Sequence, residues 1–176
     1  MDEKRLKIAE SNFKNYLDQR LLNKVPFEGI IFQTYFNNAL ESLKVAEELL
    51  KNKTSPLWVV VTSYYSMFYM ASAYIYKRGY KAKGEIVHQV INEALIILAR
   101  HNLEKHFIEE YEEEKEKALF ASGNLLKDYE LEKAKRASFQ YETTETIKEV
   151  KARTSLERAK NFIAVMRRLI DIALFP

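Results

Sequence analysis

The sequence contains no cysteine, and this absence excludes several kinds of chemistry. Disulfide frameworks, thiolate zinc sites, iron–sulfur clusters and cysteine nucleophiles all need that residue. Glycine and proline are scarce as well, with 4 and 3 residues, far below their usual shares of about 7% and 5%. An all-β fold or a glycine-rich phosphate-binding loop needs more turn-forming residues than these. What the sequence lacks therefore indicates a helical protein.

Targeting signals and cofactor motifs are also missing. The first residues, Met1 to Arg5, lead into mixed-charge sequence without an apolar segment, so we expect no secretory signal and a cytoplasmic protein. No nucleotide-binding glycine loop, metalloprotease helix motif or nucleophile elbow occurs, and we expect no cofactor. The length of 176 residues predicts one domain over residues 1–176, long enough to bury a core.

Apolar residues recur at three- and four-residue intervals along most of the chain, which is the pattern of amphipathic helices. The expected helices cover residues 3–23, 29–52, 57–76, 86–98, 103–121, 125–138 and 148–173. The expected breaks between them are Pro26, a loop at residues 81–84, a turn at Ser122-Gly123-Asn124 and a Thr-rich extended crossing at residues 140–147. The pattern predicts an all-α fold, an up-and-down helical bundle of five to six helices.

The segment at residues 57–76 contains no charged residue and is long enough to span a membrane. Its five tyrosines are scattered along it, whereas a membrane span gathers its aromatic residues at its two ends. A helix that is apolar on all sides is otherwise the centre of a bundle. We therefore expect a central buried helix and no membrane contact, with Ser55 and Pro56 at its start and Gly79 at its end.

Charged clusters elsewhere favour a solvated surface over a metal site. His101 and His106 are five residues apart, which separates them by about 140° around a helix and keeps them from converging on one ion. Six glutamates between residues 109 and 116 occur on every face of one helix. Three basic residues at seven-residue spacing form a stripe that could follow phosphates, although ordinary surface charge is the favoured interpretation: Arg153, Lys160 and Arg167.

Several segments carry a resemblance to a known family. They are Ser63-Tyr64-Tyr65-Ser66-Met67-Phe68-Tyr69-Met70-Ala71, then Lys77-Arg78-Gly79-Tyr80-Lys81-Ala82-Lys83 with His88 after it, then Arg136-Ala137-Ser138-Phe139-Gln140-Tyr141 and Ala159-Lys160-Asn161-Phe162-Ile163. Together they resemble the HEPN-domain superfamily, whose helical members are often encoded beside a small nucleotidyltransferase. The resemblance covers residues 30–173 and leaves a first helix, within residues 1–24, as an addition.

The resemblance implies a site around Arg136. Active HEPN proteins are metal-independent endoribonucleases in which an arginine is followed, after four to six residues, by a histidine. Arg136 fits the arginine, but Tyr141 stands where the histidine is expected. A phenol with an ordinary pKa near 10 is a poor base at neutral pH. Arg136 would then hold a phosphate, with Gln140, Tyr141 and His88 shaping the pocket; if the site is active, Arg136 and Tyr141 are its catalytic residues.

Three functions remain open at this point. The resemblance favours a non-catalytic or weakly active HEPN-like protein that binds a nucleotide, RNA or a nucleotidyltransferase partner, as in a toxin–antitoxin module. The second is an endoribonuclease with a degenerate arginine–histidine site, in which Tyr141 or His88 replaces the missing histidine. The third is a helical adaptor in which Arg136 and Tyr141 only anchor the crossing segment. A homodimer is expected in any case, because the chain has more large apolar helix faces than a small bundle needs.

Overall fold

The computed structural model describes the backbone of residues 3–130 and 145–172 and the side chains of residues 3–120 and 148–171. In these ranges the helices are α1 (Glu3–Asp18), α2 (Gly29–Lys51), α3 (Pro56–Lys77), α4 (Val87–Ala99), α5 (Lys105–Glu130) and α6 (Glu145–Ile172). Two short strands, β1 (Leu22–Lys24) and β2 (Tyr80–Ala82), pair as an antiparallel ribbon. The predicted helical bundle is confirmed, and the ribbon is a small addition to it.

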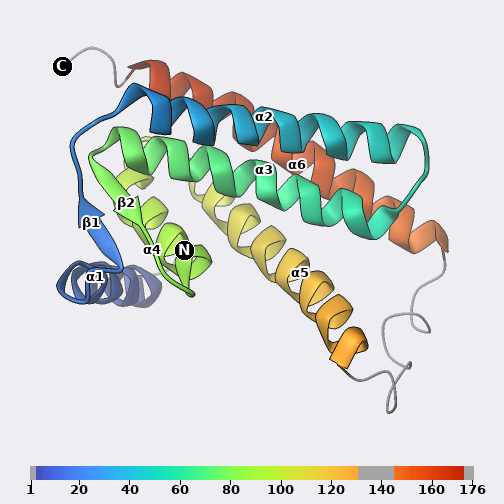
Figure 1. The fold of residues 1–176 in the computed structure, drawn as a ribbon, viewed down its shortest axis with the longest axis horizontal. Helices are drawn as coiled ribbons and strands as arrows, with labels where there is room; N and C mark the ends of the chain where they lie inside the picture. Colours follow the sequence, from blue (N-terminus) through green and yellow to red (C-terminus); the bar gives the residue numbers. More distant parts are fainter. Residues whose placement is uncertain (1–2, 131–144, 173–176) are drawn as a thin grey trace.

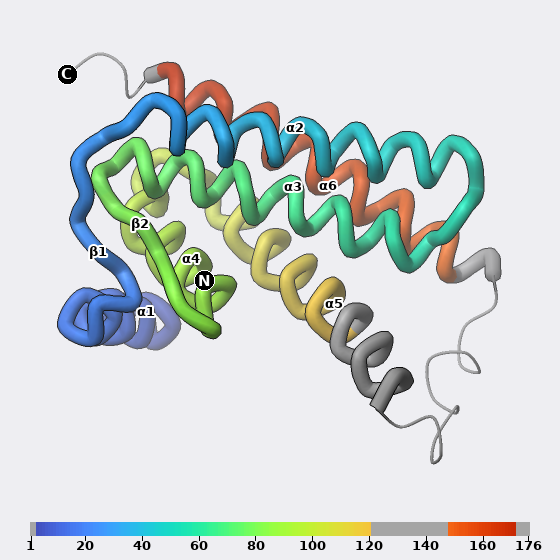
Figure 2. Tube along the Cα trace, viewed as in Figure 1, coloured from blue at the N-terminus to red at the C-terminus, as the bar shows by residue number. Residues whose placement is uncertain are grey.

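Helix α3 lies at the centre of the bundle. It packs against α2, α4, α5 and α6, and helices α2, α3 and α6 run alongside one another (Figure 1). Helix α5 crosses below them obliquely, while α1, α4 and the ribbon gather at one end (Figure 2). This end is where segments distant in sequence meet, because α1 packs on α4 and β1 pairs with β2.

The sequence explains the bounds and the burial of α3. The Ser55 hydroxyl accepts a hydrogen bond from the Trp58 backbone N–H at 3.4 Å, and Pro56 occupies the first helical position. Beyond the helix, Gly79 has a φ of 83°, a left-handed conformation that turns the chain into β2. The uncharged residues between these points are largely buried. Among the described residues, no helix combines the length and hydropathy needed to cross a membrane.

Tyrosine hydroxyls in α3 bind backbone carbonyl groups of the surrounding segments. Tyr74 donates to the carbonyl of Leu98 at 3.0 Å, and Tyr76 donates to the carbonyl of Pro26 at 3.2 Å. Both rings are almost fully buried, so an unpaired hydroxyl would be costly, by about 1–3 kcal/mol. These bonds fix the α4 end and the β1–α2 connection against the central helix.

The expected helix over residues 3–23 was wrong at its end. Helix α1 stops at Asp18, and β1 follows where the apolar spacing still predicted helix. Arg20 has a φ of 58°, and the N–H of Leu21 bonds back to the carbonyl of Tyr16, as at a helix C-terminus. The completely buried Leu22 then joins the core from a strand. The expected loop at residues 81–84 likewise contains part of β2.

The expected turn at Ser122-Gly123-Asn124 was also wrong, because α5 continues through it to Glu130. One glycine inside a helix costs only about 1 kcal/mol relative to alanine, which the neighbouring turns can offset. Helix α6 begins at Glu145, so the predicted extended crossing at residues 140–147 ends as helix. The rest of that crossing, and the part of the expected helix 125–138 after residue 130, lie outside the described residues.

Candidate functional site

The residues predicted for the site fall into two groups. Arg136, Gln140 and Tyr141 lie outside the described residues. His88 lies within them, as the second residue of α4, and is half-buried where α4 meets α3. The geometry of the candidate site is therefore the geometry around His88.

The His88 imidazole is held by aromatic side chains of α3. Its Nδ1 lies 2.8 Å from the hydroxyl oxygen of Tyr64. Its ring centroid lies 4.4 Å from that of Phe68 and 5.8 Å from that of Tyr65, with Tyr65 edge-on. One hydrogen bond and two ring contacts fix both the position and the plane of the imidazole.

The protonation of the Tyr64–His88 pair follows from burial. Burial raises the pKa of the Tyr64 hydroxyl, so the hydroxyl stays protonated. It donates a hydrogen bond to Nδ1 of His88. Burial, and to a smaller extent the charge of Lys115, lowers the pKa of His88. The imidazole is therefore neutral near pH 7 and carries its proton on Nε2. In the described part of the chain Nε2 has no hydrogen-bond partner, which leaves one N–H donor for a ligand.

Tyr64 in turn is anchored in the core. Its fully buried ring lies 5.9 Å from that of Tyr111 in α5, and Tyr111 stacks on Phe162 of α6 at 5.4 Å. Burial also raises the pKa of Tyr111. The chain of contacts from His88 therefore passes through α3 and α5 to α6, so the imidazole is positioned by three helices besides its own.

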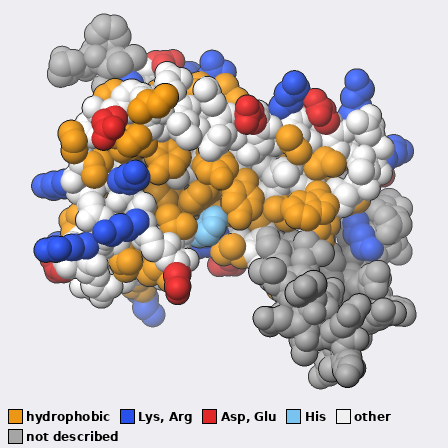
Figure 3. Space-filling model, in the orientation of Figure 1, with side chains coloured by type: hydrophobic (Ala, Val, Ile, Leu, Met, Phe, Trp, Pro, Cys, Tyr) orange, Lys and Arg blue, Asp and Glu red, His pale blue; other side chains and the backbone are white. Residues whose placement is uncertain are grey.

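Beside His88, one face of α3 presents aromatic rings that the rest of the bundle only partly covers. We call this the aromatic face; its residues are Trp58, Tyr65 and Tyr69, at spacings of seven and four. Trp58 is 48% exposed, and Tyr65 and Tyr69 are half-buried. Figure 3 shows hydrophobic side chains gathered across the middle of the molecule, with lysine and arginine mostly at the margins. A stacking surface next to a free N–H donor suits a base or another planar group.

Two ion networks join helices near this region, and the sequence interpretation missed both. Arg5 of α1 binds Glu93 of α4 at 2.7 Å and Glu112 of α5 at 2.6 Å, and Asn92 also donates to Glu112 at 3.1 Å. The available signal was Asn92-Glu93, two polar residues set among the apolar residues of α4, which indicates buried partners.

The second network joins α5 to α6. The carboxylate of Glu114 is completely buried and binds both Arg158 and Lys117 at 2.9 Å. Arg158 also binds Glu113 at 2.8 Å. These partners show that the glutamate run of α5 serves helix packing, and among the described residues no group of three or more acidic or histidine side chains could hold a metal ion.

The predicted basic stripe on α6 makes local contacts. Arg153 pairs with Glu149 at 3.4 Å, and Lys160 pairs with Glu47 at 3.3 Å. The Arg167 guanidinium lies 5.7 Å from the centroid of a phenylalanine ring in α2. Since two of the three charges have carboxylate partners, the contacts favour ordinary surface charge.

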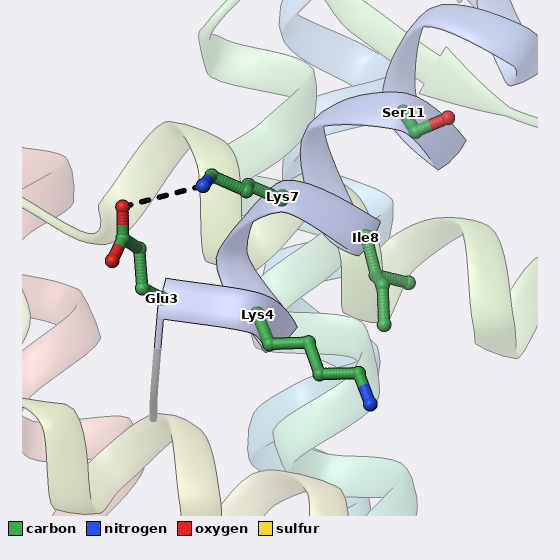
Figure 4. Close-up of a pocket in the computed structure, with 5 residues that line it drawn as sticks. All are labelled: Glu3, Lys4, Lys7, Ile8 and Ser11. Atoms are coloured by element: carbon green, nitrogen blue, oxygen red, sulfur yellow. Dashed lines mark ion pairs between the residues drawn. The ribbon is translucent and has the colours of Figure 1, made fainter.

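The surface of α1, a helix distant in sequence from the basic residues of α6, carries an open depression. Five side chains of that single helix line it, and Lys7 pairs with Glu3 at 3.4 Å across one turn (Figure 4). Their side chains point outward from one helix and do not converge on a common point (Figure 4). The depression is the outer surface of α1 and provides no enclosed site.

Comparison with protein families identifies a domain in this chain. The HEPN domain matches residues 32–169, which is most of the chain. The chain belongs to the HEPN family. Neither the curated proteins nor the solved structures that were compared gave a match. The HEPN match begins inside α2 and ends inside α6, so it includes the aromatic face, His88 and the three predicted site residues beyond the described ranges. Helix α1, with Arg5, lies before the match, whereas the partners of Arg5 lie within it.

Proposed function

We propose that this HEPN protein binds RNA or a nucleotide through a site that combines Arg136, Gln140 and Tyr141 with His88, and that it acts in the cytoplasm. The observation that carries the proposal is the Tyr64–His88 pair beside the aromatic face. It supplies a fixed N–H donor next to rings on which a base can stack. Arg136 supplies the charge for a phosphate group in this proposal.

The state of His88 favours binding over catalysis. A general base needs a free lone pair pointing at the proton that it removes. On His88 the unprotonated nitrogen is Nδ1, and that atom already accepts the hydrogen bond from Tyr64. The free Nε2 carries a proton, so it donates to a phosphate oxygen and does not activate a hydroxyl. Tyr141, in place of the family's histidine, is equally weak as a base.

Fluorescence anisotropy with a labelled uridine octamer, and competition by ATP, tests this proposal at fixed salt. We expect Arg136→Ala to weaken binding about tenfold to a hundredfold, because a charge-assisted bond to phosphate is lost. His88→Ala should weaken it as well, by about tenfold. Two matched controls, His101→Ala and Arg168→Ala, remove exposed side chains of the same types and should leave affinity unchanged. Equal affinity of the wild type and all four variants would show that neither Arg136 nor His88 contributes to binding.

The endoribonuclease remains the second candidate, and the family membership is the observation behind it. It is tested by incubating the protein with total RNA in the presence of a chelator. We infer a binding protein, so the wild type should leave the RNA intact. If Tyr141→His then cleaves RNA, the site is a catalytic pocket that lacks one group, and the nucleotidyltransferase pairing expected for a toxin–antitoxin module gains support.

A further inference from the structure

Among the described residues, no strand pairs with the edge of β2 that faces away from β1. In the register of the ribbon, Asn23 lies opposite Lys81, and the neighbouring bonds run from Lys83 to Leu21 and from Val25 to Gly79, each 2.9 Å long. Hydrogen-bonded residues alternate along an antiparallel strand, so residues 79, 81 and 83 direct their backbone groups toward β1. The N–H and C=O groups of Tyr80 and Ala82 therefore point away from β1. They bond to no other residue in the described ranges.

This edge lines a cavity of about 200 Å³. Residues 80–82 form one wall, and α2, α3 and α4 form the others. The opposing side chains are mainly apolar: Tyr35, Phe68, Ser72, Val87 and Ile91. Figure 1 shows β1 on one side of β2 and the helices on the other, and residues 80–82 are half-buried, so this edge is only partly covered. An unpaired strand edge beside apolar side chains is the arrangement that accepts an added strand.

The surface around this edge is basic. Residues 77–85 contain four basic residues and one acidic residue, Glu85. The cations are Lys77, Arg78, Lys81 and Lys83. Lys77 and Arg78 lie over aromatic rings, and none of the four pairs with a carboxylate among the described residues. An occupant of this edge therefore gains from negative charge.

We propose that β2 is a docking site for an extended acidic peptide segment of a partner protein, which adds to the ribbon as a third strand. The backbone groups of Tyr80 and Ala82 bind its main chain. Alternate side chains of the segment enter the cavity, and its acidic side chains meet the lysines. This function is separate from the proposed site at His88.

Three occupants of the β2 edge can be compared by their charge and their backbone chemistry: a second copy of this chain, RNA and an acidic peptide. A second copy of this chain would bring the same four cations to the edge, and the two copies would repel each other. RNA has the negative charge but lacks alternating N–H and C=O groups at the spacing of a strand. An acidic peptide has both features.

The experiment uses the full chain and a fluorescein-labelled eight-residue peptide in which Glu alternates with Val. Its control is the peptoid with the same side chains, which has no backbone N–H. Anisotropy should detect the peptide and not the peptoid, and binding should weaken as salt is added. Amide hydrogen exchange by NMR gives the direct readout. With peptide bound, the Tyr80 and Ala82 amides should exchange about tenfold more slowly, whereas the Lys81 amide, already bonded to β1, should not change.

A variant of the edge adds a second measurement. Ala82→Pro removes the outward N–H without touching a bond to β1, and proline is tolerated at such an edge. It should weaken peptide binding by about threefold to tenfold, while Ala82→Ser, which keeps the N–H, should bind as the wild type does. If Ala82→Pro fails to fold, amide hydrogen exchange of Tyr80 and Ala82 in the wild type still shows whether the peptide binds at this edge. Absence of binding at millimolar peptide, equal binding by the peptoid, or protection of the two amides by a uridine octamer would overturn the proposal.

Discussion

His88 shows how a single half-buried residue can make the stability of the fold depend on pH. Its pKa is lowered in the folded protein, so the unfolded chain takes up a proton at this position first as the pH falls. The contribution to stability is complete above the ordinary histidine pKa of about 6.5 and is lost as the pH drops toward the folded value. Lys115 acts in the same direction, because it repels the imidazolium.

We therefore predict that His88→Gln loses less stability than the wild type between pH 7 and pH 5. Glutamine cannot take up a proton, and its amide can still meet the Tyr64 hydroxyl. The free energy of unfolding from urea titrations at the two pH values measures the difference. His101→Gln is the control, because it makes the same substitution at an exposed histidine. A steeper loss in His88→Gln than in the wild type would contradict the assignment of the neutral imidazole.

Residue roles were predictable from the sequence only where they did not depend on a distant partner. His88 could be named from the family pattern, but its partner Tyr64 lies 24 positions away. Nothing in the spacing indicates that these two side chains meet. The buried Glu114 illustrates the same limit, because its run of glutamates is typical of a solvated helix and its partner Arg158 lies on another helix.

Helix α1 is an added element that lies outside the HEPN match and is held by few polar contacts. Its principal one is Arg5, whose guanidinium bridges Glu93 and Glu112. The side chain of Glu93 is only 6% exposed, so removal of Arg5 leaves a carboxylate with little access to water. Breaking a buried pair in this way costs up to about 3–5 kcal/mol, and the partial exposure of Arg5 reduces that figure.

We predict that Arg5→Met lowers the free energy of unfolding by about 2–3 kcal/mol. The matched control is Arg100→Met, whose partner Glu10 is 44% exposed and which should cost less than about 1 kcal/mol. Urea unfolding of the two variants at pH 7 measures both. Adding Glu93→Gln to Arg5→Met should restore part of the loss, because the buried charge is removed. Similar losses in the two single variants would show that burial of Glu93 does not decide how α1 is held.

At the level of elements, helix starts were predicted better than helix ends. Ser55 and Pro56 mark the start of α3 through a side-chain hydrogen bond and a fixed φ, both of which are local. Three-residue strands cannot be predicted in this way, because β1 and β2 exist through their pairing across more than fifty residues. Helix α5 continues through Gly123 to Glu130, because a single glycine is only a weak local preference against helix.

For the whole molecule, the sequence predicted the architecture but only part of the candidate site. An uncharged helix of twenty residues is either a membrane span or the centre of a bundle, and its scattered tyrosines argue against a span. The position of α3 could therefore be inferred. The cavity beside β2 could not, because its walls come from three helices and from a strand that the sequence does not indicate. A site is predictable when its residues are adjacent in sequence and difficult to predict when the fold assembles it.

The aromatic face leads to the prediction for the assembled molecule. Trp58 is 48% exposed at one end of a helix that is otherwise the most buried element, and aromatic residues are enriched at interface centres. We predict a homodimer that pairs through the Trp58 end of this face and leaves Tyr65, beside His88, for a ligand; its mass should be near twice the monomer's 20.7 kDa at micromolar concentration. Light scattering after size-exclusion chromatography measures it. Trp58→Glu should give the monomer mass without unfolding, because the side chain is exposed and a charge in an apolar interface is costly. Ile8→Glu, at a similar exposure of 45% on the outer face of α1, should remain dimeric. A wild-type mass near 20.7 kDa, or dissociation by both variants alike, would exclude pairing through the aromatic face.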